Sequence, residues 1–85
     1  MKTFNYVITD EQGVHARPAG ELIKACKNYA CKITMTKDGK VGDCKKIFTI
    51  MGLGVKCGNE VVMSFDGADE DAACAEIEAF MKANL

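Results

Sequence analysis

The residues with the most distinctive chemistry lie close together, in the segment G-V-H-A-R-P-A-G at positions 13–20. The chain has one histidine, His15, one arginine, Arg17, and one proline, Pro18. An imidazole two residues from a guanidinium can serve as a nucleophile beside a cation that holds an anion. The segment therefore predicts an anion-binding or phosphoryl-accepting site. The alternative is that both side chains are ordinary solvated residues at the start of a helix.

The segment is expected to open a helix that runs from about Ala16 to Tyr29. Apolar residues recur there at helical spacing, at Ala19, Leu22, Ile23, Cys26 and Ala30. Pro18 suits the first turn, where a main-chain N–H has no partner within the helix. The N–H groups of Ala16 and Arg17 and the positive end of the helix dipole would favour a phosphate at this point.

The remaining elements follow from changes in periodicity and from turn residues. Alternating residues predict strands at 3–8, 32–37 and 61–65, and an Asp38-Gly39 turn leads into a short strand at 40–43. Residues 47–53 suggest a short helix, and Asp69 is expected to cap a last helix with Ala73, Ile77, Phe80 and Met81 buried. The order β-α-β-β-α-β-α predicts an α+β fold, an open-faced sandwich with the helices on one face of the sheet.

Composition narrows the class of protein. We expect the 85 residues to form a single domain, 1–85, and the net charge of −1 does not suggest a nucleic-acid partner. No apolar run is long enough to span a membrane, and the alternating N-terminus does not resemble a signal peptide, so a cytoplasmic location is expected. No disulfides, cofactors or bound metals are expected, because none of the five cysteines, Cys26, Cys31, Cys44, Cys57 and Cys74, forms a C-x-x-C pair.

The stretch G-V-H-A-R-P-A closely resembles the active-site motif of the histidine-containing phosphocarrier family of the bacterial sugar phosphotransferase system. The resemblance extends over the chain: K-I-T-M-T-K-D-G-K, I-M-G-L-G-V-K-C-G-N-E-V and G-A-D-E-D-A-A are similar to later segments of that family. It implies a four-stranded antiparallel sheet with three helices on one face. It also implies that His15 accepts a phosphoryl group at Nδ1 and that Arg17 stabilises the phosphate.

The implied partners are enzyme I, which donates the phosphoryl group, and the A domains of sugar permeases, which receive it. Such a protein is a carrier and not a turnover enzyme by itself, and we expect it to be a monomer. By resemblance, Ile47, Phe48 and Met51 match positions that dock onto these partners. We expect these three residues to form an exposed apolar patch and Ile50 and Leu53 to fill the core, because so short a helix cannot bury all five.

Lys46 departs from the pattern of the family's Gram-positive members, which carry a regulatory serine at the matching position. Lysine cannot accept that phosphate, so control by a serine kinase is expected to be absent. Lys45 and Lys46 are read as solvated charges or as a positive patch that favours acidic partners. Two other functions remain as alternatives: a regulatory paralogue that signals by docking, and a generic binding domain for peptide or RNA. The sequence does not indicate which sugars are served, or whether the sugar or the nitrogen-regulatory branch uses the protein.

Overall fold

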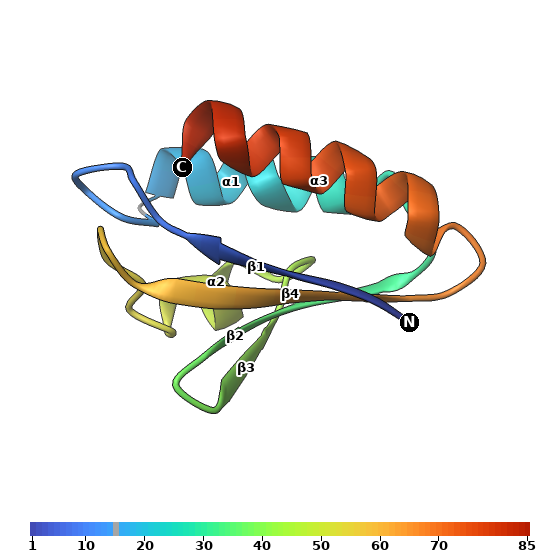
Figure 1. The fold of residues 1–85 in the computed structure, drawn as a ribbon, viewed down its shortest axis with the longest axis horizontal. Coiled ribbons are helices and arrows are strands. Elements are labelled where there is room, and N and C mark those ends of the chain that lie inside the picture. Colours follow the sequence, from blue (N-terminus) through green and yellow to red (C-terminus); the bar gives the residue numbers. More distant parts are fainter. Residues whose placement is uncertain (15) are drawn as a thin grey trace.

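The computed structural model describes residues 1–14 and 16–85. These residues form four strands and three helices in the predicted order (Figure 1). The elements are β1 (Lys2–Val7), α1 (Ala16–Cys26), β2 (Lys32–Lys37), β3 (Lys40–Asp43), α2 (Ile47–Met51), β4 (Glu60–Asp66) and α3 (Glu70–Asn84).

The strands make one antiparallel sheet in the order β1-β4-β2-β3. The last strand, β4, therefore lies between the first two strands of the chain, and Ser64 is aligned with Thr3 on one side and Thr34 on the other. In Figure 1, α1 and α3 lie over the same side of the sheet, while α2 packs against α1 and β3. The predicted fold class, an open-faced α+β sandwich, is confirmed.

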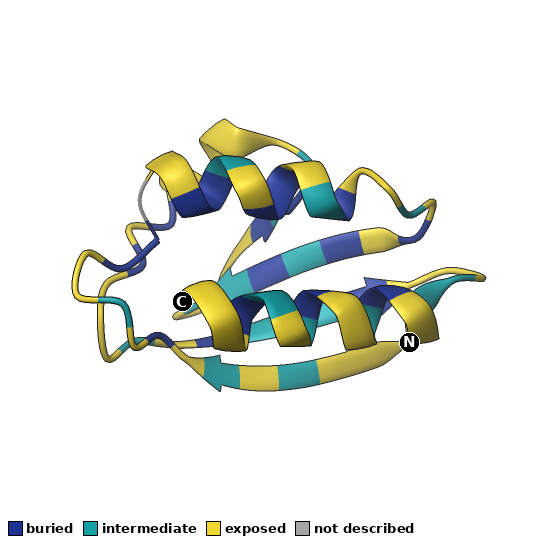
Figure 2. Cartoon of the chain, turned by 90° about the horizontal axis from the view of Figure 1, so that it is seen from above, coloured by how far each residue is buried: buried dark blue, intermediate teal, exposed yellow. Residues whose placement is uncertain are grey.

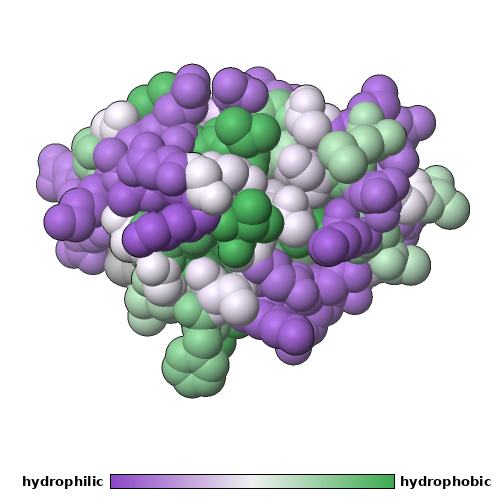
Figure 3. Space-filling model, turned by 90° about the horizontal axis from the view of Figure 1, so that it is seen from below, coloured by the Kyte–Doolittle hydropathy of each residue, from purple (hydrophilic) through white to green (hydrophobic). Residues whose placement is uncertain are grey.

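The core lies between the sheet and the helices. Alternate residues of β4, Val61, Met63 and Phe65, are fully buried. Buried residues from one side of each long helix complete the core, as the dark bands in Figure 2 show. The face of the sheet away from α1 and α3 is mixed, with small hydrophobic areas separated by hydrophilic side chains (Figure 3). The amphipathic patterns seen in the sequence are therefore explained by burial on one side of the sheet.

The first helix is shorter than predicted, because it ends at Cys26 and not at Tyr29. The main-chain N–H groups of Asn28 and Tyr29 bond to oxygens only three residues back, which tightens the chain into a turn. Ala30, predicted in the buried stripe, is exposed in this turn. The α2 helix likewise ends at Met51, short of the predicted Leu53, and Phe80 is only partly buried.

The carboxylate of Asp69 does not cap α3, contrary to the sequence-based expectation. Asp69 occupies the N-cap position, but its side chain makes no capping hydrogen bond to its own helix. Instead it accepts hydrogen bonds from the main-chain N–H groups of Ala30 and Cys31, at 2.8 and 2.9 Å. These two groups lie just before β2, where no strand neighbour pairs with them in the described sheet. The acid thus joins two distant segments of the chain.

Candidate functional site

The loop before α1 is held against the loop between α2 and β4. The Val14 N–H donates to the Val55 oxygen at 3.1 Å, and Gly13 donates to the Asp10 oxygen at 2.9 Å. Gly13 has a φ of 69°, and a Cβ atom there would lie 2.6 Å from the Lys56 Cα. Only glycine fits this close approach without strain. The next residue, His15, lies outside the described residues, so its predicted role stays a prediction.

The first turn of α1 supplies the features that the sequence predicted around that position. The helix begins at Ala16, Pro18 lies within its first turn, and no acidic residue occurs there. Ala16 and Arg17 are both exposed, whereas Pro18 is buried. The N–H groups at the start of a helix have no partner within the helix and lie at its positive end, so this turn is suited to an anion.

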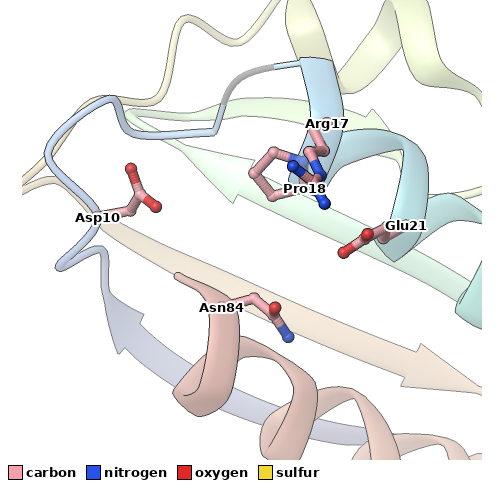
Figure 4. Close-up of a pocket in the computed structure, with 5 residues that line it drawn as sticks. All are labelled: Asp10, Arg17, Pro18, Glu21 and Asn84. Carbon is pink, nitrogen blue, oxygen red and sulfur yellow. The ribbon is translucent and has the colours of Figure 1, made fainter.

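Arg17 borders a depression of about 290 Å³ between the start of α1, the loop after β1 and the end of α3 (Figure 4). The other lining residues are Asp10, Pro18, Glu21 and Asn84. Main-chain N–H groups of Thr9 and Asp10 donate to the Leu85 oxygen at 2.5 and 2.9 Å, which holds the end of α3 beside the loop. Within residues 1–14 and 16–85, Arg17 forms no ion pair. Its guanidinium can therefore reach an incoming anion without first breaking such a contact.

Sequence reasoning missed three residues of this depression as site residues. Glu21 lies four residues after Arg17, and the i, i+4 spacing on one helix could have indicated it. Neither Asp10 nor Asn84 was given a role from the sequence. These two residues approach Arg17 because the loop after β1 is bonded to the chain end that follows α3. No local pattern in the sequence indicates that contact.

The α2 helix exposes the three apolar residues that the sequence assigned to its surface. Phe48 is 88% exposed, Met51 39% and Ile47 36%, whereas Ile50 is 1% exposed. The predicted division between surface and core is confirmed, and Leu53 is also buried. We call Ile47, Phe48 and Met51 the α2 patch. An exposed aromatic side chain beside two aliphatic ones is typical of a protein contact surface.

The two lysines before α2 have different environments. The Lys45 ammonium donates to the main-chain oxygen of Tyr29 at 2.6 Å, so Lys45 is a structural contact and not simply a solvated charge. Lys46 is exposed and occupies the N-cap position of α2 without a side-chain cap. Lys37 also bonds to the main chain, at the Gly54 oxygen, 3.1 Å away. Lys46 therefore remains an exposed positive charge next to the α2 patch.

Charge is distributed unevenly over the fold. Most lysines lie on α1, β2, β3 and the loops on either side of α2, between Lys24 and Lys56. Most acidic residues lie on β4, α3 and the turn between them, between Glu60 and Glu78. The α3 helix packs on β1 and β4, whereas α2 packs on β3 at the other edge of the sheet. The α2 side of the molecule is therefore positive and the α3 side negative.

Three shifted pKa values, of Tyr29, Cys31 and Asp69, belong to structural contacts near the far end of α1. The Tyr29 hydroxyl donates to the Glu76 carboxylate, and this raises the pKa of Tyr29 to about 12. Burial raises the pKa of the Cys31 thiol to about 11. The hydrogen bond from Ala30 lowers the pKa of Asp69. Tyr29 and Cys31 follow the last turn of α1 and Asp69 lies just before α3, so these contacts hold the fold and are separate from the depression at the first turn of α1.

The cysteines are free thiols, as far as the structure describes them. Cys26, Cys31 and Cys44 are buried, Cys74 is partly buried and Cys57 is exposed. Among the described side chains, no group of three or more histidine, cysteine or acidic residues could hold a metal ion. In the same part of the chain, no helix has the length and apolar character needed to cross a membrane.

The sequence and the fold both match known proteins. The family described as "PTS HPr component phosphorylation site" matches residues 2–83. The chain belongs to the HPr phosphocarrier family. The phosphocarrier protein HPr of Mycoplasma capricolum is 37% identical over 81 residues, which are 95% of this chain and 91% of that protein. HPr of Mycoplasma genitalium is 35% identical, over 99% of this chain and 97% of that protein.

Solved structures show the same relationship to HPr. The histidine-containing phosphocarrier protein of Mycoplasma has a TM-score of 0.94 and 35% identity, covering 96% of this chain and 93% of that chain. The catabolite repression protein Crh of Bacillus subtilis, described as a swapped dimer, has a lower TM-score of 0.79. It is 29% identical and covers 89% of this chain and 87% of that chain. Sequence and structure therefore both associate this chain with the phosphocarrier proteins of the phosphotransferase system.

Proposed function

We propose that this protein carries a phosphoryl group on Nδ1 of His15. The observation that carries the proposal is the H-A-R-P segment at the start of α1 in a chain that matches the HPr family over residues 2–83. In the first transfer the bond from phosphorus to Nδ1 forms while the bond to the donor nitrogen of enzyme I breaks, and its electron pair stays on the donor. In the second transfer the bond to Nδ1 breaks, its electron pair stays on Nδ1, and a bond from phosphorus to the acceptor nitrogen forms. The covalent intermediate on His15 replaces one difficult phosphoryl transfer with two easier ones.

Arg17 is the proposed phosphate stabiliser. Its exposure, its place in the first turn of α1 and its position at the depression support this role. A guanidinium offers several N–H donors in a planar fork that fits phosphate oxygens. The main-chain N–H groups of Ala16 and Arg17 would add further donors to the same group. Only His15 would change covalently, and it passes the phosphoryl group on to another protein, so we propose that the chain is a carrier and not a turnover enzyme by itself.

Enzyme I is the proposed donor, and the A domains of sugar permeases are the proposed acceptors. The α2 patch would dock onto both, because it combines exposed apolar surface with the nearby positive charge of Lys46. Acidic partner surfaces would be favoured by this arrangement. We propose that the protein acts as a monomer in the cytoplasm, since each partner must in turn reach the same side of the molecule.

Control by a serine kinase is proposed to be absent. The position that matches the regulatory serine carries Lys46, which is exposed at the start of α2 and has no hydroxyl group. Thr49, three residues later, donates its hydroxyl hydrogen bond to main-chain oxygens of Asp43 and Lys46, at 2.7 and 2.8 Å. Because that hydroxyl is already used within the fold, we do not propose Thr49 as a substitute for the regulatory serine.

A regulatory paralogue that signals by docking is the second candidate, because the Crh fold is also similar. The higher TM-score with the Mycoplasma phosphocarrier and the intact H-A-R-P segment favour the carrier. The test is phosphotransfer from labelled phosphoenolpyruvate through active enzyme I, with His15→Ala as the control. Acid-labile, base-stable label on the wild type and none on the variant is expected. An unlabelled wild type would contradict the carrier function and favour the regulatory paralogue that signals by docking.

A further inference from the structure

The depression beside Arg17 contains carboxylates that the proposed transfer does not itself require. Glu21 follows Arg17 by one helical turn of α1, both side chains are exposed, and both line the depression. Figure 4 shows the Glu21 carboxylate directed into the same space as the Arg17 guanidinium, with Asp10 on the opposite side. A phosphoryl group that approaches Arg17 therefore enters a space that already holds negative charge.

On the basis of the proposed function, we propose that Glu21 is a positioning residue that competes with the phosphoryl group for Arg17. Residues at i and i+4 of a helix lie on the same face and attract each other when oppositely charged. Arg17 and Glu21 are not within ion-pair distance in the structure, so the proposed attraction acts across the depression without a close contact. Arg17 can then turn toward the phosphoryl group and return toward Glu21 after transfer.

This competition would favour onward transfer. Glu21 forms no bond to phosphorus, and the phosphorus–nitrogen bond on His15 still breaks as the bond to the acceptor forms. By attracting Arg17, Glu21 weakens the stabilisation of the phosphorylated carrier relative to the unphosphorylated one. The equilibrium between enzyme I and the carrier is then less favourable to the carrier, and the group passes to the next acceptor more readily.

Glu21 also borders a neighbouring depression with Lys24, so its effect must be traced to Arg17. We would compare wild type, Glu21→Gln and Glu21→Asp, each with Arg17 intact and with Arg17→Gln. Asp71→Asn is the matched control, because it removes one negative charge at the opposite end of α3 from Asn84. Each protein is incubated with enzyme I at a fixed ratio of phosphoenolpyruvate to pyruvate, and the phosphorylated fraction is measured at equilibrium.

Glu21→Gln is expected to raise the equilibrium constant for phosphorylation of the carrier about twofold at low salt, which is the size of an exposed helical charge pair. Glu21→Asp and Asp71→Asn should match the wild type. The effect of Glu21→Gln should disappear at about 1 M salt and in the Arg17→Gln background. A folding defect would not show this dependence on salt and on Arg17.

Two results would overturn the proposal for Glu21 while the carrier function stands. One is an unchanged equilibrium in Glu21→Gln when the wild type is readily phosphorylated. The other is a twofold effect that persists in the Arg17→Gln background, which would mean that Glu21 repels the phosphoryl group directly. A wild type that accepts no phosphoryl group from active enzyme I would instead reject the proposed function itself.

Discussion

The main-chain N–H of Cys31 donates a hydrogen bond of 2.9 Å to the carboxylate of Asp69, 38 residues later in the chain. The neighbouring Gly67 packs so closely that a Cβ atom there would lie 2.6 Å from the Cβ of Cys31. The turn after α1 is thus fixed to the turn before α3. Because α1 begins at the proposed site, this contact helps to set the position of the helix as a whole.

Replacement of Asp69 by asparagine is expected to lower stability at neutral pH. The hydrogen bonds lower the pKa of Asp69, so its contribution is present above the unfolded-state pKa of about 3.9 and is lost as pH falls through the lower folded-state pKa. Urea unfolding at pH 7 and at pH 3 would measure this difference. The difference in free energy of unfolding between wild type and Asp69→Asn should be smaller at pH 3 than at pH 7. Equal stability at pH 7 would show that the contact contributes nothing.

Tyr29 should ionise later than an ordinary tyrosine. Its bond to Glu76 raises the pKa to about 12, so the stabilisation is complete below the unfolded pKa of about 10 and is lost as pH rises toward 12. Ultraviolet titration of tyrosinate in wild type, Tyr29→Phe and Glu76→Gln would measure the pKa of Tyr29. We expect the late transition to be absent from Tyr29→Phe and to move to lower pH in Glu76→Gln. A Tyr29 that ionises near pH 10 in both the wild type and Glu76→Gln, as judged by the difference from Tyr29→Phe, would contradict the contact.

Gly13→Ala is expected to destabilise the protein by more than about 1 kcal/mol, because a side chain there meets the main chain of Lys56 at a positive φ. Phosphorylation by enzyme I should also slow, since Gly13 lies two residues before His15. Gly20→Ala is the matched control: Gly20 is helical and has open space around it, so alanine should stabilise α1 by about 0.5–1 kcal/mol. Denaturant unfolding of the two variants should therefore shift in opposite directions.

Phe48→Ala should leave stability within about 0.5 kcal/mol of the wild type, because the side chain is 88% exposed. If the α2 patch docks onto enzyme I, the same change should weaken binding of the carrier to enzyme I by about 1–2 kcal/mol, seen as a higher KM for the carrier with kcat unchanged. Ile50→Ala is the contrasting variant, since it should cost about 2–5 kcal/mol of stability. An unchanged KM in Phe48→Ala would place the docking surface elsewhere.

Lys46→Ser should create the hydroxyl group that the chain lacks at this position. An ATP-dependent kinase that modifies the regulatory serine of Gram-positive HPr proteins is expected to label Lys46→Ser and not the wild type. Mass spectrometry of the intact proteins would show the addition. Label on the wild type would indicate a different acceptor, such as Thr49 or Ser64, and would contradict the proposed absence of serine-type control.

Much of this fold could be predicted because its signals are local. The alternation of Val61, Met63 and Phe65 and the helical spacing of Leu22 and Cys26 each report which side of an element is buried. The exposure of Phe48 followed from the shortness of α2. Spacing and resemblance were sufficient for these features. The types and closeness of His15 and Arg17 drew attention to them, and the resemblance then implied their roles.

Contacts between distant segments could not be predicted in this way. Asp69 has the type and position of a helix cap, and only the folded chain shows that Ala30 and Cys31 compete for its carboxylate. Lys45 looked like a surface charge until the turn containing Tyr29 was in place. Asn84 and Arg17 line the same depression although they are far apart in the chain. A contact between such distant segments leaves no periodic pattern in the sequence, so it could not be predicted.

The separation of lysines and acids across the sheet makes this nearly neutral protein an electric dipole. Its net charge of −1 predicts little attraction or repulsion at long range. At distances near the Debye length, about 8 Å in physiological salt, an acidic partner instead exerts a torque that turns the α2 side toward itself. The direction of the dipole, more than the net charge, would then determine which surface meets such a partner first.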